Sequence, residues 1–126
     1  TVKRMGEKTV QALKDAYGTR PEDLICAIGP SICVDCYEVS QDTINEFRKN
    51  YSQSECELII QPENKPGKYL LNLPGADYIN LINAGVRPEN IYLSDVCTSE
   101  NSDILFSHRA SSGKRGIMCN FIKIIN

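Results

Sequence analysis

The sequence predicts a mixed α and β fold, because segments typical of helices and of strands alternate along its 126 residues. Several predicted strands follow one another without an intervening helix, which argues against an all-parallel sheet. Hydrophobic residues make up 41% and charged residues 24% of the chain, a balance typical of globular proteins and unlike that of disordered chains. This length corresponds to one domain or to part of one.

The first predicted helix covers residues 2–17, where apolar residues recur at nearly helical spacing and Gly18 provides a stop. Residues 24–30 are a compact apolar run that ends in Gly-Pro, which predicts a short buried strand. Ser40 is the predicted N-cap of a second helix over residues 41–51, in which apolar side chains again follow helical spacing.

Residues 36–40 form a second short extended piece ahead of that helix. Residues 56–61 and 69–73 are predicted strands, joined by a turn with the sequence Asn-Lys-Pro-Gly-Lys. Asn72 is the predicted cap of a further helix that carries Pro in its first turn and stops at Gly85.

The last third of the chain has little helical periodicity. Residues 90–95 are a predicted strand, residues 97–116 a polar loop that contains the single histidine, and residues 116–125 a closing strand of mixed burial. Helices and strands thus interleave without a repeat or a linker, and the chain is expected to fold as one unit.

Charge and composition exclude several classes of partner. The net charge is −2 with scattered Lys and Arg, so no basic patch for nucleic acid is expected. No apolar run is long enough for a membrane helix. Six cysteines occur without a secretory signal, which favours a reduced, cytoplasmic protein, and Cys26 and Cys119 lie in apolar runs where a free thiol acts as a small hydrophobe.

Cys33 and Cys36 have the spacing of a metal knuckle or a redox pair, and a third interpretation is ordinary packing. A zinc knuckle requires a second pair of ligands, and the other four cysteines stand alone in the sequence. A thioredoxin-type pair lies at a helix N-terminus, whereas a strand-like triplet follows Cys36. Packing is the favoured interpretation.

Hydroxyl and cationic residues alternate around a glycine in residues 107–115, a mixture that suits an oxyanion such as phosphate. His108 is the only imidazole, so any nucleophilic pair with a histidine base must use it. The alternative is an ordinary solvated loop. Glu38 is an isolated carboxylate in an apolar triplet, either a functional group or a strand residue that faces solvent.

Four segments together resemble, in order and spacing, the C-terminal half of the YfiH family, whose members are labelled laccase-domain protein, multicopper polyphenol oxidase and purine nucleoside phosphorylase. The resemblance runs through nearly the whole chain. Its segments are residues 29–40, 68–86, 91–109 and 113–116.

The resemblance implies a three-layer α/β/α fold with a mixed sheet, incomplete in this chain. Family members carry His-Ala-Gly-Trp-Arg-Gly just upstream of the first helix, so residues 1–126 are expected to be the C-terminal portion of a single YfiH-type domain without its N-terminal metal-binding portion. The family's zinc ligands, two histidines and a cysteine, would precede Thr1. No residue here then inherits a metal-ligand role, and the Cys33–Cys36 spacing is incidental.

By resemblance, the full-length protein is expected to be a zinc-dependent purine nucleoside phosphorylase that acts with phosphate on adenosine, inosine, guanosine and methylthioadenosine, with some hydrolytic adenosine deamination. Alternatives are a copper-dependent, laccase-like polyphenol oxidase and a non-catalytic fragment. The chain alone is expected to be inactive, and exposed sheet edges would favour a homodimer or other association.

The resemblance also implies roles for particular residues. Glu38 and Arg109 are expected to be catalytic, and Ser107, His108, Arg109 and Arg115 to bind substrate. The family often has a second arginine after the first, and Ala110 stands there in this chain. Cys97 and Thr98 are expected to shape the loop that presents these side chains.

Overall fold

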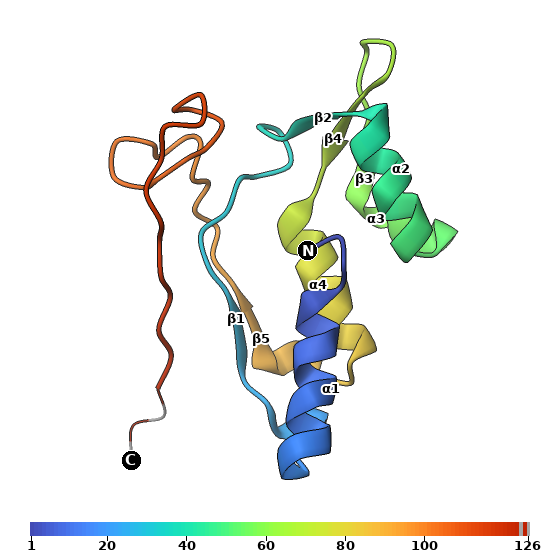
Figure 1. The fold of residues 1–126 in the computed structure, drawn as a ribbon, viewed down its shortest axis with the longest axis vertical. Helices are drawn as coiled ribbons and strands as arrows, with labels where there is room; N and C mark the ends of the chain where they lie inside the picture. Colours follow the sequence, from blue (N-terminus) through green and yellow to red (C-terminus); the bar gives the residue numbers. More distant parts are fainter. Residues whose placement is uncertain (124, 126) are drawn as a thin grey trace.

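The computed structural model describes residues 1–123 and 125, and within them four α-helices accompany two small sheets (Figure 1). The helices are α1 (Met5–Tyr17), α2 (Gln41–Asn50), α3 (Gln53–Ile59) and α4 (Leu73–Asn83). The strands are β1 (Cys26–Ile28), β2 (Glu38–Ser40), β3 (Ile60–Pro62), β4 (Lys68–Leu71) and β5 (Ile91–Leu93). Short 3₁₀ turns at Pro21–Asp23 and Pro88–Asn90 precede β1 and β5.

The strands pair in both directions, which confirms the predicted mixed class. β1 and β5 are parallel, with Cys26 opposite Ile91, although they are far apart in sequence. β2, β4 and β3 form an antiparallel sheet in that order, with Val39 opposite Tyr69. The parallel and antiparallel pairs thus belong to two separate sheets in the described part of the chain.

The buried apolar residues form two clusters, one beside each sheet. The first packs α2 and α3 against the antiparallel sheet and includes Ile44, Ile59 and Leu71, which are almost completely buried. The second packs α1 and α4 against the parallel pair and is centred on Val10, Val86 and Ile91. Figure 1 shows α1 and α4 side by side next to β1 and β5.

Local signals explain where most elements begin and end. Gly18 ends α1 in the left-handed conformation, with φ 67°, and donates its N–H to Lys14 O at 2.9 Å. The Asn72 side chain accepts from Gly75 N at 2.9 Å and caps α4, as predicted. Ser40 stands at the N-cap position of α2, but its side chain makes no capping hydrogen bond.

The strand predicted over residues 56–61 is wrong in its first part, because α3 extends to Ile59 and only β3 follows. Ser52 and Glu55 form a capping box: the Ser52 side chain accepts from Glu55 N at 3.3 Å, and the Glu55 carboxylate accepts from Ser52 N at 2.7 Å. This reciprocal cap starts a helix in a segment whose apolar residues alone suggested a strand.

The strand predicted over residues 116–125 is also wrong for residues 116–123 and 125, which have no strand assignment; Ile124 lies outside the described residues. Cys119 is exposed rather than buried. A strand exists only through ladder hydrogen bonds to a partner, and hydrophobic pattern does not encode where that partner lies. The segment runs past the end of β1, where the Asn120 side-chain amide lies close to Gly29.

The first turn of the chain is tied to α3 and α4 by polar contacts around Tyr51. The Tyr51 hydroxyl lies 3.0 Å from Asn80 Oδ1, deep in the core, and 3.2 Å from Thr1 O. The Arg4 guanidinium stacks on the Tyr51 ring at 4.8 Å and pairs with Glu55 at 3.5 Å.

No helix in the described residues is long and apolar enough to cross a membrane.

Leu71 gives a direct test of the antiparallel core. Leu71→Ala should lower the free energy of unfolding by about 2–5 kcal/mol, since it removes a fully buried side chain and leaves a cavity. Leu58→Ala is the matched control, because Leu58 is 71% exposed and its loss should change stability by less than about 0.5 kcal/mol. Urea denaturation of both variants measures the difference, and equal losses would contradict this core assignment.

Glu55 should make stability depend on pH in the acid range. Burial alone would raise the pKa of Glu55, but the Ser52 backbone and the side chains of Asn83, Ser52 and Arg4 lower it to about 2, below its ordinary 4.5. A lowered folded pKa stabilises the protein above pH 4.5, and this contribution disappears as the pH falls towards 2.

The stability difference between wild type and Glu55→Gln should therefore be largest above pH 4.5 and shrink between pH 4.5 and 2. Denaturant unfolding across this range measures it. Glu57→Gln, an exposed change on the same helix, serves as the control. A difference that stays constant with pH would show that the Glu55 carboxylate is not stabilised by these contacts.

Candidate functional site

A pocket of about 530 Å³ opens where the β1–β2 connection, the start of α4 and the loop after β5 meet. Most of its wall is polar or cationic, and apolar side chains complete it. The lining residues are Ile32, Tyr37, Leu73, Thr98, Ser107, His108, Arg109 and Arg115. Four of the five predicted site residues thus lie in one cavity although they were identified from sequence alone.

Two chain segments that line this pocket continue the parallel pairing of β1 and β5 beyond the ends of the strands. Ser94 N donates to Ile28 O at 2.9 Å, and further along Ser31 and Cys97 form an isolated parallel bridge. Thr98 N donates to Ser31 O at 3.0 Å. Backbone hydrogen bonds therefore fix the start of the loop after β5, the late loop, against residues that precede β2.

The late loop is folded on itself by local hydrogen bonds. Ser107 is 5% exposed; its hydroxyl accepts from Ala110 N at 3.2 Å, and its carbonyl accepts from the Ser111 hydroxyl at 2.6 Å. Gly113, with φ 90°, donates its N–H to His108 O at 2.9 Å. Short hydroxyl side chains and a left-handed glycine therefore close a tight turn that holds His108 and Arg109 at the pocket.

Arg109 connects this loop to the β2 strand. Both terminal nitrogens of its guanidinium donate to Glu38 O at 3.0 Å, and the guanidinium carbon lies 5.3 Å from the centre of the Tyr37 ring. The two contacts hold the planar group at the pocket wall. A guanidinium fixed in this way is preorganised for an anion.

His108 and Arg115 are also paired. Arg115 Nε donates to His108 Nδ1 at 3.2 Å, so Nδ1 is the acceptor in this contact. Arg115 Nη1 lies 3.5 Å from Gly116 O. Two arginines and a histidine therefore border the same cavity.

The Glu38 carboxylate lies elsewhere. It pairs with Lys65 at 3.1 Å and Lys68 at 3.3 Å, and these lysines lower the pKa of Glu38. Its side chain is not part of the pocket lining, and its link to the site is the backbone carbonyl that Arg109 binds. The catalytic role expected for Glu38 stays a prediction.

Sequence reasoning missed Ile32 and Leu73, which are apolar and far apart in the chain. Nothing in their local pattern distinguishes them from core residues, and only the folded arrangement brings them to the pocket. Leu73 is the first residue of α4, so the positive end of that helix borders the cavity. The apolar side chains supply a surface on which a planar ring can pack.

A cluster of metal-binding groups lies beside this pocket. Cys33, Cys36, Cys97 and Glu100 each offer a ligand atom, and all four atoms lie within 4.8 Å of one another. Cys36 Sγ is 3.8 Å from Glu100 Oε1, and Cys33 N donates to Cys97 Sγ at 3.4 Å. The sequence argument against a zinc knuckle rested on a missing second pair, and the fold supplies one.

The thiols in this cluster influence one another. The Cys33 thiol, burial and the Cys97 thiol raise the pKa of Cys36 to about 12. Burial alone would raise the pKa of Cys97, but backbone N–H groups of Cys33, Glu100 and Ser99, together with the Cys33 thiol, lower it. Negative charge is therefore best accommodated at Cys97, the most buried of the three.

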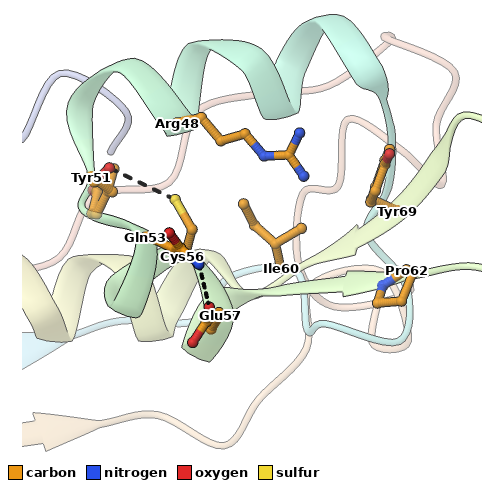
Figure 2. Close-up of a pocket in the computed structure, with 8 residues that line it drawn as sticks. All are labelled: Arg48, Tyr51, Gln53, Cys56, Glu57, Ile60, Pro62 and Tyr69. Atoms are coloured by element: carbon orange, nitrogen blue, oxygen red, sulfur yellow. Dashed lines mark hydrogen bonds between the residues drawn. The ribbon is translucent and has the colours of Figure 1, made fainter.

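A second pocket, of about 600 Å³, lies between α2, α3 and the edge of the antiparallel sheet and is shown in Figure 2. Its lining mixes the Arg48 guanidinium with Tyr69, Ile60 and Pro62, and Cys56 Sγ lies 3.9 Å from Tyr51 O at its inner end. None of the predicted site residues lines it. The predicted site residues Ser107, His108, Arg109 and Arg115 line the smaller pocket instead.

The sequence profile of the family described as multi-copper polyphenol oxidoreductase laccase matches residues 1–125. The chain belongs to this family. Of its relatives, purine nucleoside phosphorylase YlmD of Bacillus subtilis is 30% identical over 122 residues, which cover 97% of this chain and 43% of the relative. Adenosine deaminase RL5, from an unknown prokaryotic organism, is 30% identical over 109 residues, which cover 86% of this chain and 40% of the relative.

The solved structure of a relative confirms the fold of this chain. YlmD from Geobacillus stearothermophilus superposes with a TM-score of 0.81 at 30% identity, over 91% of this chain and 42% of that structure. The chain therefore spans less than half the length of these relatives. The predicted family and the predicted fold class are both confirmed.

Proposed function

We propose that this chain contributes the anion-binding wall of a purine nucleoside phosphorylase active site. The observation that carries the proposal is the convergence of Ser107, His108, Arg109 and Arg115 on one pocket. The names of relatives such as YlmD support the same reaction class. Inorganic phosphate and a purine nucleoside are the proposed substrates.

Phosphate binding accounts for the cationic side of the pocket. Arg109 and Arg115 border it, and guanidinium groups suit a dianion. Arg109 is held in place by Glu38 O and Tyr37, so little side-chain entropy is lost when phosphate binds. Ala110, where relatives often carry a second arginine by resemblance, leaves Arg115 as the second cation.

The proposed reaction forms a bond between a phosphate oxygen and C1 of the ribose while the bond from C1 to the purine nitrogen breaks. The purine leaves with the electron pair of that bond and takes up a proton, and the products are ribose 1-phosphate and the free base. Positive charge develops on the sugar during this step, so a phosphate fixed close to C1 stabilises it. The arginines position the phosphate, and His108 and Ser107 provide hydrogen bonds.

The apolar part of the pocket suits the nucleoside. Ile32, Leu73 and the Tyr37 ring present the kind of surface that packs against a purine, and a volume of about 530 Å³ is within the range of small-molecule sites. Adenosine, inosine, guanosine and methylthioadenosine share the purine ring that these side chains would contact. The choice among them is proposed to depend on residues outside this wall.

The pocket does not fit a catalytic metal by itself. Its only imidazole accepts a hydrogen bond from Arg115, and two arginine side chains adjoin it, so a divalent cation would meet positive charge there. We therefore route no step through zinc or copper in this pocket. The expected catalytic zinc ligands are proposed to lie in sequence upstream of Thr1.

Adenosine deamination is a second candidate activity, because RL5, a relative at 30% identity, is named an adenosine deaminase. Water would replace phosphate as the nucleophile and ammonia would leave. Copper-dependent phenol oxidation, which the family's description suggests, is the third. Release of ammonia from adenosine, or oxygen uptake with a phenol and copper, would distinguish these activities from phosphorolysis.

Residues 1–126 are proposed to be the C-terminal portion of a longer domain, consistent with the share of each relative that they cover. A reducing, cytoplasmic setting is proposed, in which cysteines stay reduced and available as metal ligands. The chain alone is proposed to be inactive. The longer protein is therefore the material for the activity test.

In the longer protein, hypoxanthine should be released from inosine only when phosphate is present. Arg115→Ala should raise the KM for phosphate by roughly 10- to 100-fold, since a charged hydrogen bond contributes about 1.5–3 kcal/mol. Chromatography of the released base measures both effects. Thermal unfolding of the variant checks that the fold is retained.

Arg20→Ala is the matched control, because Arg20 is an exposed arginine that pairs locally with Glu22 and is not part of the pocket lining. It should leave the KM for phosphate unchanged. Release of hypoxanthine without phosphate would overturn phosphorolysis. An Arg115→Ala enzyme with an unaltered KM for phosphate would remove this side chain from the anion site.

A further inference from the structure

We propose that Cys33, Cys36, Cys97 and Glu100 form a structural zinc site that joins the β1–β2 connection to the loop after β5. This site is distinct from any catalytic metal and does not depend on the proposed enzymatic function. Its evidence is the geometry of four donor groups that lie together in the fold.

The donors lie on two turns with the same internal spacing. Cys33-x-x-Cys36 is one turn, and Cys97-x-x-Glu100 is the other. Structural zinc sites are commonly built from two such turns that face each other, each supplying two ligands three residues apart. The second turn escapes a search for cysteine pairs because its last ligand is a carboxylate.

The distances fit a tetrahedral ion. A zinc–sulfur bond of about 2.3 Å places sulfur ligands about 3.8 Å from one another. Cys36 Sγ and Glu100 Oε1 are already 3.8 Å apart, and no two of the four ligand atoms are more than 4.8 Å apart. Closure around zinc therefore requires movements of about 1 Å or less, within reach of side-chain rotation.

The surroundings favour a cation at this point. Cys33 N donates to Cys97 Sγ at 3.4 Å, the type of backbone contact that supports a thiolate ligand. Three thiolates and a carboxylate whose ligand atoms lie within 4.8 Å of one another would repel each other. A divalent ion reduces this repulsion and takes all three sulfurs as thiolates.

The donor set selects among metals. Three thiolates favour soft or borderline ions such as zinc and copper(I) over magnesium or calcium, and a carboxylate as fourth ligand favours zinc over copper(I). All four positions of a tetrahedron are filled by protein. Such a closed site has a structural rather than a catalytic role.

Each cysteine adjoins a residue of the anion pocket. Ile32 precedes Cys33, Tyr37 follows Cys36, and Thr98 follows Cys97. Zinc would therefore hold three wall residues of that pocket in fixed register. The backbone bond from Thr98 N to Ser31 O, at 3.0 Å, is the contact that the ion would reinforce.

The test measures zinc in the 126-residue chain purified under reducing conditions without added nucleoside or phosphate. Elemental analysis should find about one zinc per chain, and cobalt substitution should give the absorption of a tetrahedral thiolate site. Cys36→Ser and Cys97→Ser should each lose the metal. Cys119→Ser, which changes an exposed cysteine outside the cluster, should retain it.

Glu100 provides variants that should fold, because its side chain is exposed. Glu100→Ala should weaken zinc binding by at least about tenfold in competition with a chromophoric chelator, and Glu100→Cys should restore or tighten it. Chelation should also speed amide exchange at Thr98 in the wild-type chain. This readout tests the structural role separately from the metal count.

Several results would overturn the proposal. These are zinc well below one equivalent in the wild-type chain, zinc retained by the Cys36 and Cys97 variants, copper in place of zinc, or a disulfide among the three cysteines in protein kept under reducing conditions. Each can occur whether or not the longer protein is a phosphorylase. Conversely, loss of phosphorolysis in the Arg115 variant would leave the zinc result unchanged.

Discussion

The contact between residues 31–37 and the segment that starts at Cys97 is the constraint on which the functional end of this molecule depends. It continues the parallel pairing of β1 and β5 through the Ser31–Cys97 bridge and the hydrogen bond from Thr98 N to Ser31 O. Only a few backbone hydrogen bonds make this connection. Side-chain contacts from Arg109 to Glu38 O and to the Tyr37 ring reinforce it on the far side of the pocket.

The two sheets differ in how well their side chains are buried. The antiparallel sheet with α2 and α3 contains the best-buried side chains, such as Ile44 and Leu71, and is a stable platform. The parallel pair is only three residues long in each strand, and its β5 side chains Tyr92 and Leu93 are largely exposed. The end that contains the pocket is therefore the less stable part, where an additional link would have most effect.

Much of the fold could be predicted from the sequence because its signals are local. Gly18 at the end of α1, Asn72 before α4 and the turn at Gly67 act on backbone within a few residues. The wrong strand predictions arose where a local signal was overlooked or where the partner that would form the strand is distant in sequence. The Ser52–Glu55 capping box is an example of the first kind, and residues 116–123 are an example of the second.

The candidate site also combines residues that the local sequence identifies with residues whose position depends on distant contacts. Ser107, His108, Arg109 and Arg115 lie within nine residues, so the composition of one loop identified them, and the fold places all four at one cavity. Glu38 was selected as an isolated carboxylate, but its orientation depends on Lys65 and Lys68 across a hairpin that the triplet around it does not encode. Ile32 and Leu73 carry no signal beyond hydrophobicity.

The thiol cluster and the anion pocket impose opposite electrostatic demands on neighbouring backbone. Residues 33–36 and 97–100 collect groups that can become negative, while Arg109 and Arg115 bring positive charge further along the second of these segments. The raised pKa of Cys36 keeps its thiol protonated in the absence of an ion, whereas zinc would take all three sulfurs as thiolates and offset two of the four negative charges that they and Glu100 then carry. The metal would therefore act on the pocket chiefly through geometry, by fixing the positions of Ile32, Tyr37 and Thr98.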